Sequence, residues 1–230
     1  MKKNILYQKL SLSLAFIFLL VSFFISGCLN YIQNTSIYPD GSGKMTITYW
    51  MKTSEQEFSQ VINRIGIFNA DSIRHEFTSS FIQIENISVY ADTTDSTTHA
   101  VIKISFQSVD SLNQTRVFRD SHFNFREGAS GQKIFSQFIS PIATGFGIDG
   151  SKFQVSYIYT FSGEIITHNA QSQDKQSLTW QYSLDELGSG KTISVTFRPY
   201  KIKETPVWIY ALSGIVLLVV IFFLFKKKKD

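Results

Sequence analysis

Residues 31–51 decide the fold, and they read YIQNTSIYPDGSGKMTITYWM. Two runs rich in β-branched and aromatic side chains, 31–38 and 44–51, flank a turn-forming sequence: Pro39, Asp40, Gly41, Ser42 and Gly43. Runs of this composition around such a turn predict a β-hairpin. The second run alternates, which predicts one apolar face made of Met45, Ile47, Tyr49 and Met51.

Strand-like runs continue through most of the chain after this hairpin. They are rich in β-branched and aromatic residues, many of them alternate, and they cover 82–91, 100–107, 122–126, 133–139, 153–161, 178–184 and 193–197. The polar residues between the first two runs predict a second hairpin, and Gly128 and Gly131 predict a turn between the third and the fourth.

Helical patterns are fewer. Ser54 and Glu57 have the spacing of a capping box, and the apolar residues after them recur at helical intervals: Phe58, Val61, Ile62 and Ile65. We expect a second short helix at 71–78 and a helical connection at 109–118. The whole pattern predicts one α+β domain over 28–206, with a mostly antiparallel sheet and one or two packed helices.

The N-terminal end has the pattern of a lipoprotein signal peptide over 1–27. Three lysines accompany an apolar run that ends in Ile25, Ser26, Gly27 and Cys28. These four residues resemble the lipobox of bacterial lipoproteins, in which the thiol receives a diacylglyceryl group and the peptide is cut before it. Cys28 is the only cysteine, so an internal disulfide is excluded. The alternative is an uncleaved anchor with an incidental cysteine, and both place the domain outside the cytoplasm.

The C-terminal end has the pattern of a transmembrane helix over 207–225. This segment carries no charge, and at 1.5 Å per residue it would span roughly 28 Å, close to the hydrocarbon thickness of a bilayer. Four lysines follow it, and the positive-inside rule assigns them to a cytoplasmic tail at 226–230. We therefore expect a helix in the bacterial cytoplasmic (inner) membrane and a domain on its extracytoplasmic side.

The distribution of charge argues against nucleic acid as a partner. The chain has 22 Lys and Arg against 18 Asp and Glu, but seven of the basic residues and only one acidic residue lie in the two end segments. The domain between them is therefore slightly acidic, whereas binding to nucleic acid needs a basic face.

No group of residues has the spacing of an active site. No two of the four histidines are at a metal-ligand spacing, and we interpret all of them as surface or strand histidines: His75, His99, His122 and His168. The chain lacks a Gly-x-Ser-x-Gly elbow, and adjacent carboxylates occur only in the turn at 185–186. We expect no metal, no cofactor and no enzymatic activity.

An irregular apolar segment, 135–148, is the best candidate for a binding surface. It is rich in aromatic and aliphatic residues, yet proline and glycine interrupt it, so it does not fit a regular strand. It predicts either a loop that covers the core or an apolar surface or cavity mouth that contacts lipid or a partner. The candidate residues of that surface are Phe135, Phe138, Ile142 and Phe146.

The order of these features resembles the LppM-type bacterial membrane lipoproteins: lipobox, hairpin, helix, antiparallel strands, and one C-terminal helix with a basic tail. Two short stretches add to the resemblance, YTFSGEI at 159–165 ahead of Asn169 and LTW at 178–180. Ser162 stands where that group is expected to have proline. The resemblance implies a compact α+β extracytoplasmic domain, a role in the cell envelope and contact with lipids, and it implies no catalytic residue.

Three hypotheses about function follow. In the first, the chain is a non-enzymatic, membrane-anchored envelope lipoprotein that binds lipid or a lipid-linked glycan between sheet and helix. In the second, it is an accessory or scaffold subunit that meets another envelope membrane protein through the domain or through 207–225. In the third, it is a hydrolase whose site the sequence does not reveal.

Overall fold

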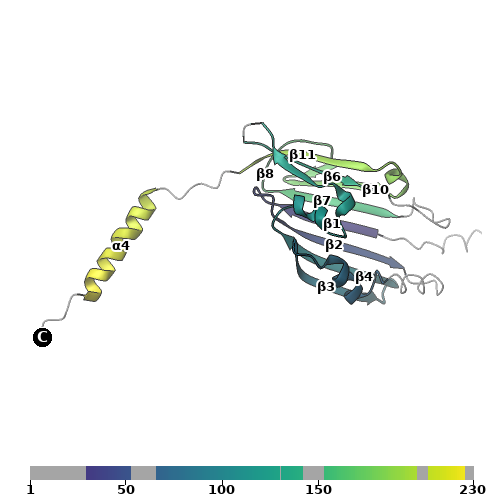
Figure 1. The fold of residues 1–230 in the computed structure, drawn as a ribbon, viewed down its shortest axis with the longest axis horizontal. Coiled ribbons are helices and arrows are strands. Elements are labelled where there is room, and N and C mark those ends of the chain that lie inside the picture. Colours follow the sequence, from purple (N-terminus) through teal and green to yellow (C-terminus); the bar gives the residue numbers. More distant parts are fainter. Residues whose placement is uncertain (1–29, 53–65, 130, 142–152, 201–206, 226–230) are drawn as a thin grey trace, which may run out of the picture. The chain divides into compact units, whose positions relative to one another are not determined.

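The computed structural model describes residues 30–52, 66–129, 131–141, 153–200 and 207–225 (Figure 1). The chain divides into two units, Met1–Pro199 and Tyr200–Asp230, and each is described by itself. The predicted helix at 54–65 lies outside the described residues, as does the whole N-terminal segment.

The described part of the first unit contains two sheets (Figure 1). The larger has the strand order β3-β4-β2-β1-β7-β10-β9, and the smaller has the order β5-β6-β11-β8. All neighbouring strands are antiparallel except β1 and β7, which are parallel. The strands are β1 Asn30–Ile37, β2 Gly43–Lys52, β3 Ile82–Asp92, β4 Thr97–Phe106, β5 Asn124–Glu127, β6 Lys133–Ile139, β7 Gln154–Phe161, β8 Gly163–His168, β9 Ser172–Asp174, β10 Ser177–Ser183 and β11 Lys191–Pro199.

The predicted hairpin at 31–51 is confirmed. β1 pairs antiparallel with β2, and the turn closes where the amide of Gly41 donates to the carbonyl of Tyr38 at 3.0 Å. Gly41 has a φ of +84°, a conformation that glycine adopts without strain. The alternating face is confirmed as well, because Met45, Ile47 and Met51 are buried.

The two sheets face each other across a shared aromatic core. Phe135 of β6 lies 4.9 Å from Tyr159 of β7, measured between ring centroids, and Phe161 of β7 lies 4.9 Å from Phe197 of β11. Aromatic pairs at such distances favour tilted packing, as seen here. These contacts bury the inner face of each sheet against the other.

The chain passes from the larger sheet to the smaller one within two residues. β7 ends at Phe161 and β8 begins at Gly163, so Ser162 alone separates them. A Cβ atom at Gly163 would lie 2.4 Å from the carbonyl oxygen of Arg198 on β11, which only glycine avoids. This glycine therefore permits the close approach of β8 to β11.

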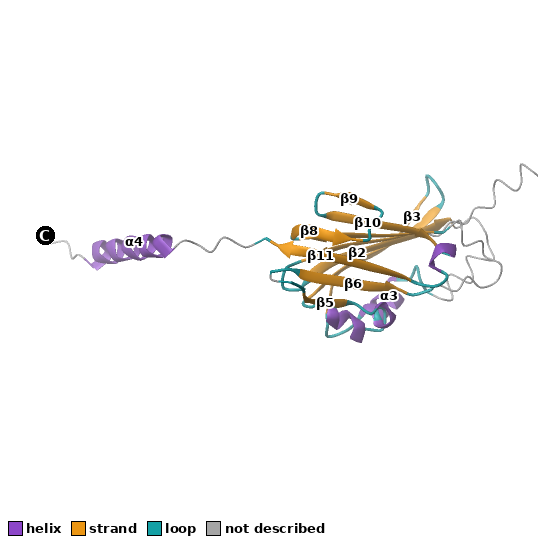
Figure 2. Ribbon diagram, turned by 90° about the horizontal axis from the view of Figure 1, so that it is seen from above, coloured by secondary structure: helices purple, strands orange, loops and turns teal. Residues whose placement is uncertain are grey.

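Helix α3, Ala70–Phe77, packs on the unit through two buried side chains, Ile73 and Phe77. Asn69 caps it, since its side-chain oxygen accepts from the amides of Asp71 and Ser72 at 3.0 and 2.9 Å. The predicted helical connection at 109–118 contains a 3-10 helix, η1, at Asp110–Gln114. Within the described residues, two further turns of this kind occur, η2 Arg119–Ser121 and η4 Asp185–Leu187. The α+β class with mostly antiparallel strand pairing is thus confirmed (Figure 2), but the strands form two sheets where the sequence predicted one.

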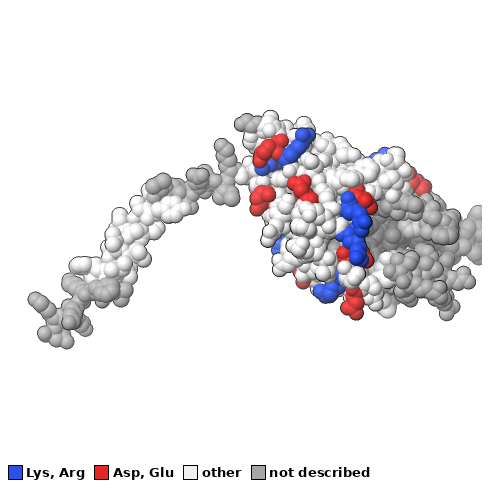
Figure 3. All heavy atoms as spheres, viewed as in Figure 1, with Lys and Arg blue, Asp and Glu red and all other residues white. Residues whose placement is uncertain are grey.

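The second unit contains the helix α4, Val207–Phe225, which has the predicted bounds. Its described side chains are apolar or uncharged, and nearly all of them are exposed (Figure 3). Within the described residues, no helix has both the length and the apolar character that a membrane span requires.

Candidate functional site

A cavity of about 730 Å³ lies beside α3, where that helix meets the larger sheet. Tyr49 of β2, the turn at Gly66 and Ile67, and Val117 complete the wall that α3 begins. The residues that α3 supplies are Asp71, Ser72, Ile73, His75, Glu76 and Phe77. The volume is within the range of about 300–1,000 Å³ that small-molecule sites occupy.

The inner part of this cavity is apolar. Ile73 and Phe77 line it from the helix, and they are four residues apart, so they lie on the same helix face. The ring of Tyr49 packs against Phe68 at 5.4 Å, and its hydroxyl donates to the carbonyl of Ile67 at 2.5 Å. Burial raises the pKa of Tyr49 to about 12, so its hydroxyl remains a neutral donor at physiological pH.

The rim of the cavity is charged. Asp71, His75 and Glu76 are exposed at its edge, and Glu76 forms an ion pair with Arg116 at 3.1 Å. Because one end is apolar and the other polar, the cavity has the character of a site for an amphiphilic molecule.

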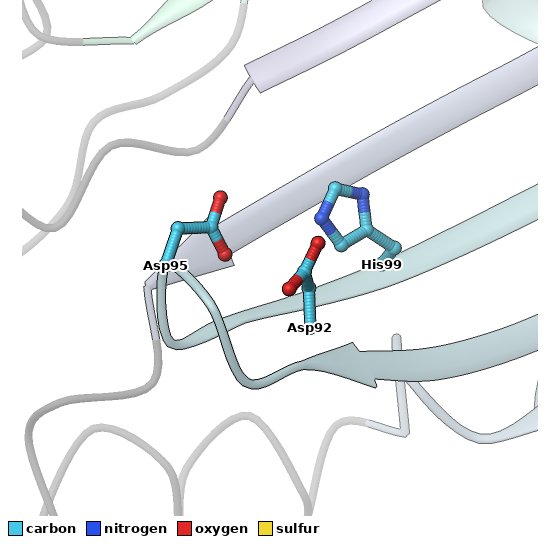
Figure 4. Close-up of side chains that lie close together, drawn as sticks. All are labelled: Asp92, Asp95 and His99. Carbon is cyan, nitrogen blue, oxygen red and sulfur yellow. The ribbon is translucent and has the colours of Figure 1, made fainter.

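A second group of polar side chains gathers at the tip of the β3–β4 hairpin. Asp92, Asp95 and His99 point toward one another, and one potential ligand atom from each lies within 4.8 Å of the others (Figure 4). Three such atoms could hold a divalent metal ion at this spacing.

Hydrogen bonds within the hairpin explain the same arrangement without an ion. Asp92 accepts from the amide and hydroxyl of Thr94 at 2.8 and 2.5 Å, and these bonds lower the pKa of its carboxyl. Asp95 accepts from the amide and hydroxyl of Thr97 at 3.1 and 2.5 Å. Aspartates commonly stabilise turns in this way.

His99 is held by rings on both faces. Its imidazole stacks on Tyr90 at 5.0 Å and on Trp50 at 5.7 Å, measured between ring centroids. The three residues are directly opposite one another on the neighbouring strands β3, β4 and β2. Its Nε2 atom lies 2.7 Å from the hydroxyl of Thr97. These contacts fix the ring and lend rigidity to the hairpin.

The Thr97–His99 contact does not form a nucleophilic pair. In a hydrolase triad the acid orients the imidazole, whereas here Asp95 accepts from the hydroxyl of Thr97. Thr97 is also buried, so a substrate cannot reach its oxygen.

Of the four residues predicted to form an apolar surface, the structure describes two, Phe135 and Phe138, and it does not bring these two together. Phe135 is fully buried in the core, which corrects its assignment to a surface. Phe138 is half-buried and covers Gly190. Because these two residues are three apart on one strand, they lie on opposite faces of the sheet. Ile142 and Phe146 lie outside the described residues, as do the lipobox residues Ile25, Ser26, Gly27 and Cys28.

The sequence interpretation missed the residues of the α3 cavity, although signals for two of its walls were present. Tyr49 was assigned correctly to the inner face of its strand, and Ile73 and Phe77 have helical spacing within the short predicted helix. It also missed the Asp92–Asp95–His99 group, because it compared the histidines only with one another and with cysteine. Pairing each histidine with nearby carboxylates would have found that group.

Comparisons with known proteins yield distant structural similarity alone. No family model matches the chain. No curated protein matches it either. Among solved structures, the chain is similar to the NMR structure of the folded domain of the Mycobacterium tuberculosis LppM protein, with a TM-score of 0.46 and 14% sequence identity. The similarity covers 78% of this chain and 95% of that chain.

Proposed function

We propose that this chain is a non-enzymatic, membrane-attached protein of the bacterial cell envelope whose folded unit binds a lipid or a lipid-linked glycan. The observation that carries the proposal is the cavity beside α3, about 730 Å³ in volume. Its inner wall of Ile73, Phe77 and the Tyr49 ring suits an acyl chain, and its charged rim suits a headgroup.

Attachment to a membrane is part of the proposal and rests on the sequence. Cys28 follows a lipobox-like sequence, and a diacylglyceryl group at this residue would hold the N-terminal end at the outer leaflet. No helix among the described residues has the length and apolar character of a membrane span, so the C-terminal anchor rests on the uncharged sequence 207–225. We propose that this segment inserts into the same bilayer, with Lys226–Lys229 on the cytoplasmic side. The exposed apolar side chains of α4 support insertion, because covering them with lipid removes a large apolar surface from water.

The test of the cavity is native mass spectrometry of the full chain, purified in detergent. Val117 lines the cavity and is 36% exposed, so Val117→Trp would fill the cavity from its open side. Ile166→Trp is the matched control, because Ile166 is 38% exposed on β8 and does not line the cavity.

We expect the wild type and Ile166→Trp to carry an added mass that matches a phospholipid or glycolipid, and Val117→Trp to lose it. The comparison of variants separates lipid in the cavity from lipid that adheres to α4. A bare protein mass for the wild type, or an adduct that survives Val117→Trp, would contradict the proposal.

The second candidate function is that of an accessory or scaffold subunit, and α4 is the observation that favours it. A helix with exposed apolar side chains can pack against a partner helix as well as against lipid. A photo-crosslinking group at Leu217 would distinguish these surroundings in native membranes. Crosslinks to one protein would favour the scaffold, and crosslinks to lipid alone would favour the anchor.

A further inference from the structure

A second, smaller cavity lies at the open end of the β3–β4 pair, at the opposite end of these strands from their hairpin tip. Its volume is about 300 Å³, which suits a small ligand rather than a lipid. Its hydrogen-bonding side chains are hydroxyls and carboxamides: Ser80, Gln83, Ser105, Gln107, Ser108 and Ser111.

The frame of this cavity is rigid. Ile82 and Phe106 lie opposite each other in the β3–β4 pair, and both are buried. The wall after β4 is tied to the β1–β2 turn, since the amide of Val109 donates to the carbonyl of Gly41 at 2.8 Å. A site with a fixed frame loses little conformational entropy when a ligand binds.

The polar groups in this cavity are available to a ligand. Across the described residues, no hydrogen bond engages the side chains of Ser80, Gln83, Ser105 or Gln107. The hydroxyl of Ser111 donates to the carbonyl of Ser108 at 2.6 Å, which leaves its oxygen free to accept. Hydroxyls and carboxamides both donate and accept, so they match a ligand that carries several hydroxyl groups.

The cavity offers no charge to a ligand, because none of its lining side chains is ionisable. Lys44, which lies opposite Ser105 on the neighbouring strand, forms an ion pair with Glu85 at 3.1 Å. A charged ligand would therefore lose water without gaining a counter-charge. The ring of Phe81, 36% exposed, adds an apolar wall on which the C–H face of a sugar can stack.

We infer that this cavity is a binding site for a small neutral sugar or a similar polyhydroxylated molecule. The inference goes beyond the proposed lipid site, since the two cavities share no lining residue. Phe81 stacks on the ligand, and Gln83 and Ser105, directly opposite each other in the strand pair, bind its hydroxyl groups.

The test uses the full chain in a detergent without a sugar headgroup, because a maltoside would compete for the site. Glucose, mannose and N-acetylglucosamine are titrated as neutral probes, with glucuronate and glucosamine as charged ones, and binding is followed by saturation-transfer NMR. The variants are Phe81→Ala and Gln83→Ala. Tyr38→Ala is the control, because Tyr38 is an aromatic residue with 39% exposure outside both cavities.

We expect at least one neutral sugar to bind with a Kd of about 1 mM or lower. We expect Phe81→Ala and Gln83→Ala to weaken binding by about three- to tenfold, and Tyr38→Ala to leave it unchanged. The inference would be overturned if none of the neutral sugars saturates the protein below about 10 mM. It would also be overturned if the wild type and both variants bind the sugar equally well. Lipid adducts that persist in Phe81→Ala would show that the larger cavity functions independently.

Discussion

Gln33, Thr35 and Gln137 are polar residues that lie in the core with almost no exposure, and a hydrogen-bond network around Tyr159 provides partners for their side chains. The hydroxyl of Tyr159 accepts from Nε2 of Gln33 at 2.8 Å and donates to Oε1 of Gln137 at 2.5 Å. Nε2 of Gln33 also reaches the hydroxyl of Thr35 at 3.3 Å. Within the described residues, no buried side-chain nitrogen or oxygen lacks a partner. The network joins the larger sheet to the smaller one through satisfied polar groups.

Tyr159→Phe should therefore destabilise the folded unit. The substitution keeps the ring but removes one hydrogen-bond partner from each of two buried carboxamides, those of Gln33 and Gln137, at a cost of about 1–3 kcal/mol in free energy of unfolding. Urea unfolding followed by tryptophan fluorescence measures the change. Tyr38→Phe is the control, because that tyrosine is exposed. If Tyr159→Phe lowers the free energy of unfolding no more than Tyr38→Phe does, a water molecule replaces the Tyr159 hydroxyl in the network.

At the scale of the elements, the passage from β7 to β8 determines how the two sheets are joined. β7 pairs with β1 in the larger sheet, while β8 pairs with β11 in the smaller one. The register of β8 and β11 shifts beside Phe197, which allows the strand to bend around the core. Gly163 lies at the point where the two backbones are closest.

We expect Gly163→Ala to lower the free energy of unfolding by roughly 1–3 kcal/mol, because the new methyl group forces β8 away from β11. Thermal unfolding of the purified chain measures this loss. Gly188→Ala is the control, since its nearest atom, the carbonyl oxygen of Asp185, is 3.3 Å away. If the two variants are equally stable, β8 can move away from β11 at Gly163 without loss of stability.

At the scale of the whole molecule, buried phenols make stability depend on alkaline pH. Burial raises the pKa of Tyr49 to about 12 and the pKa values of Tyr31, Tyr157 and Tyr159 well above the usual value. Tyrosine in the unfolded chain loses its proton near pH 10. Their contribution to stability is therefore fully present below about pH 10 and is lost as the pH rises toward the folded-state pKa values.

Urea unfolding midpoints should accordingly be insensitive to these tyrosines up to about pH 10 and fall above it. Absorbance of the phenolate at high pH, recorded on the same samples, reports ionisation directly. If these four tyrosines ionise near pH 10 while the unit remains folded, burial does not raise the pKa values of their hydroxyl groups, and the prediction is wrong.

The proposed lipid anchor makes a prediction for the whole chain. Cys28→Ala removes the thiol that the diacylglyceryl transfer needs, so the variant should incorporate no labelled fatty acid and should keep its leader. Metabolic labelling and electrophoretic mobility measure both effects. Processing identical to that of the wild type would show that 1–27 is an uncleaved anchor or that cleavage does not depend on Cys28.

The sequence by itself determined the local elements of the folded unit. Alternation over Met45, Ile47 and Met51 identified a strand and its buried face, because neighbouring strand residues point to opposite sides. The predicted hairpins and the helix at 70–77 were found for the same reason, since each depends on residues close together in the chain. The short strands β8 and β9 were missed. β9 is polar and exposed throughout, β8 mixes two isoleucines with polar residues without alternating, and the pairing of both depends on partners elsewhere.

Only the tertiary structure decided which elements meet. The parallel pairing of β1 with β7 joins residues more than 100 positions apart, and alternation specifies a face but not a partner. The same limit explains why Phe135 was assigned to a surface and is buried, and why Gln33 is buried although it is polar. The α3 cavity likewise exists because β2, α3 and Val117 converge in space. Burial and cavities are properties of long-range packing, and that information is absent from any single stretch of the chain.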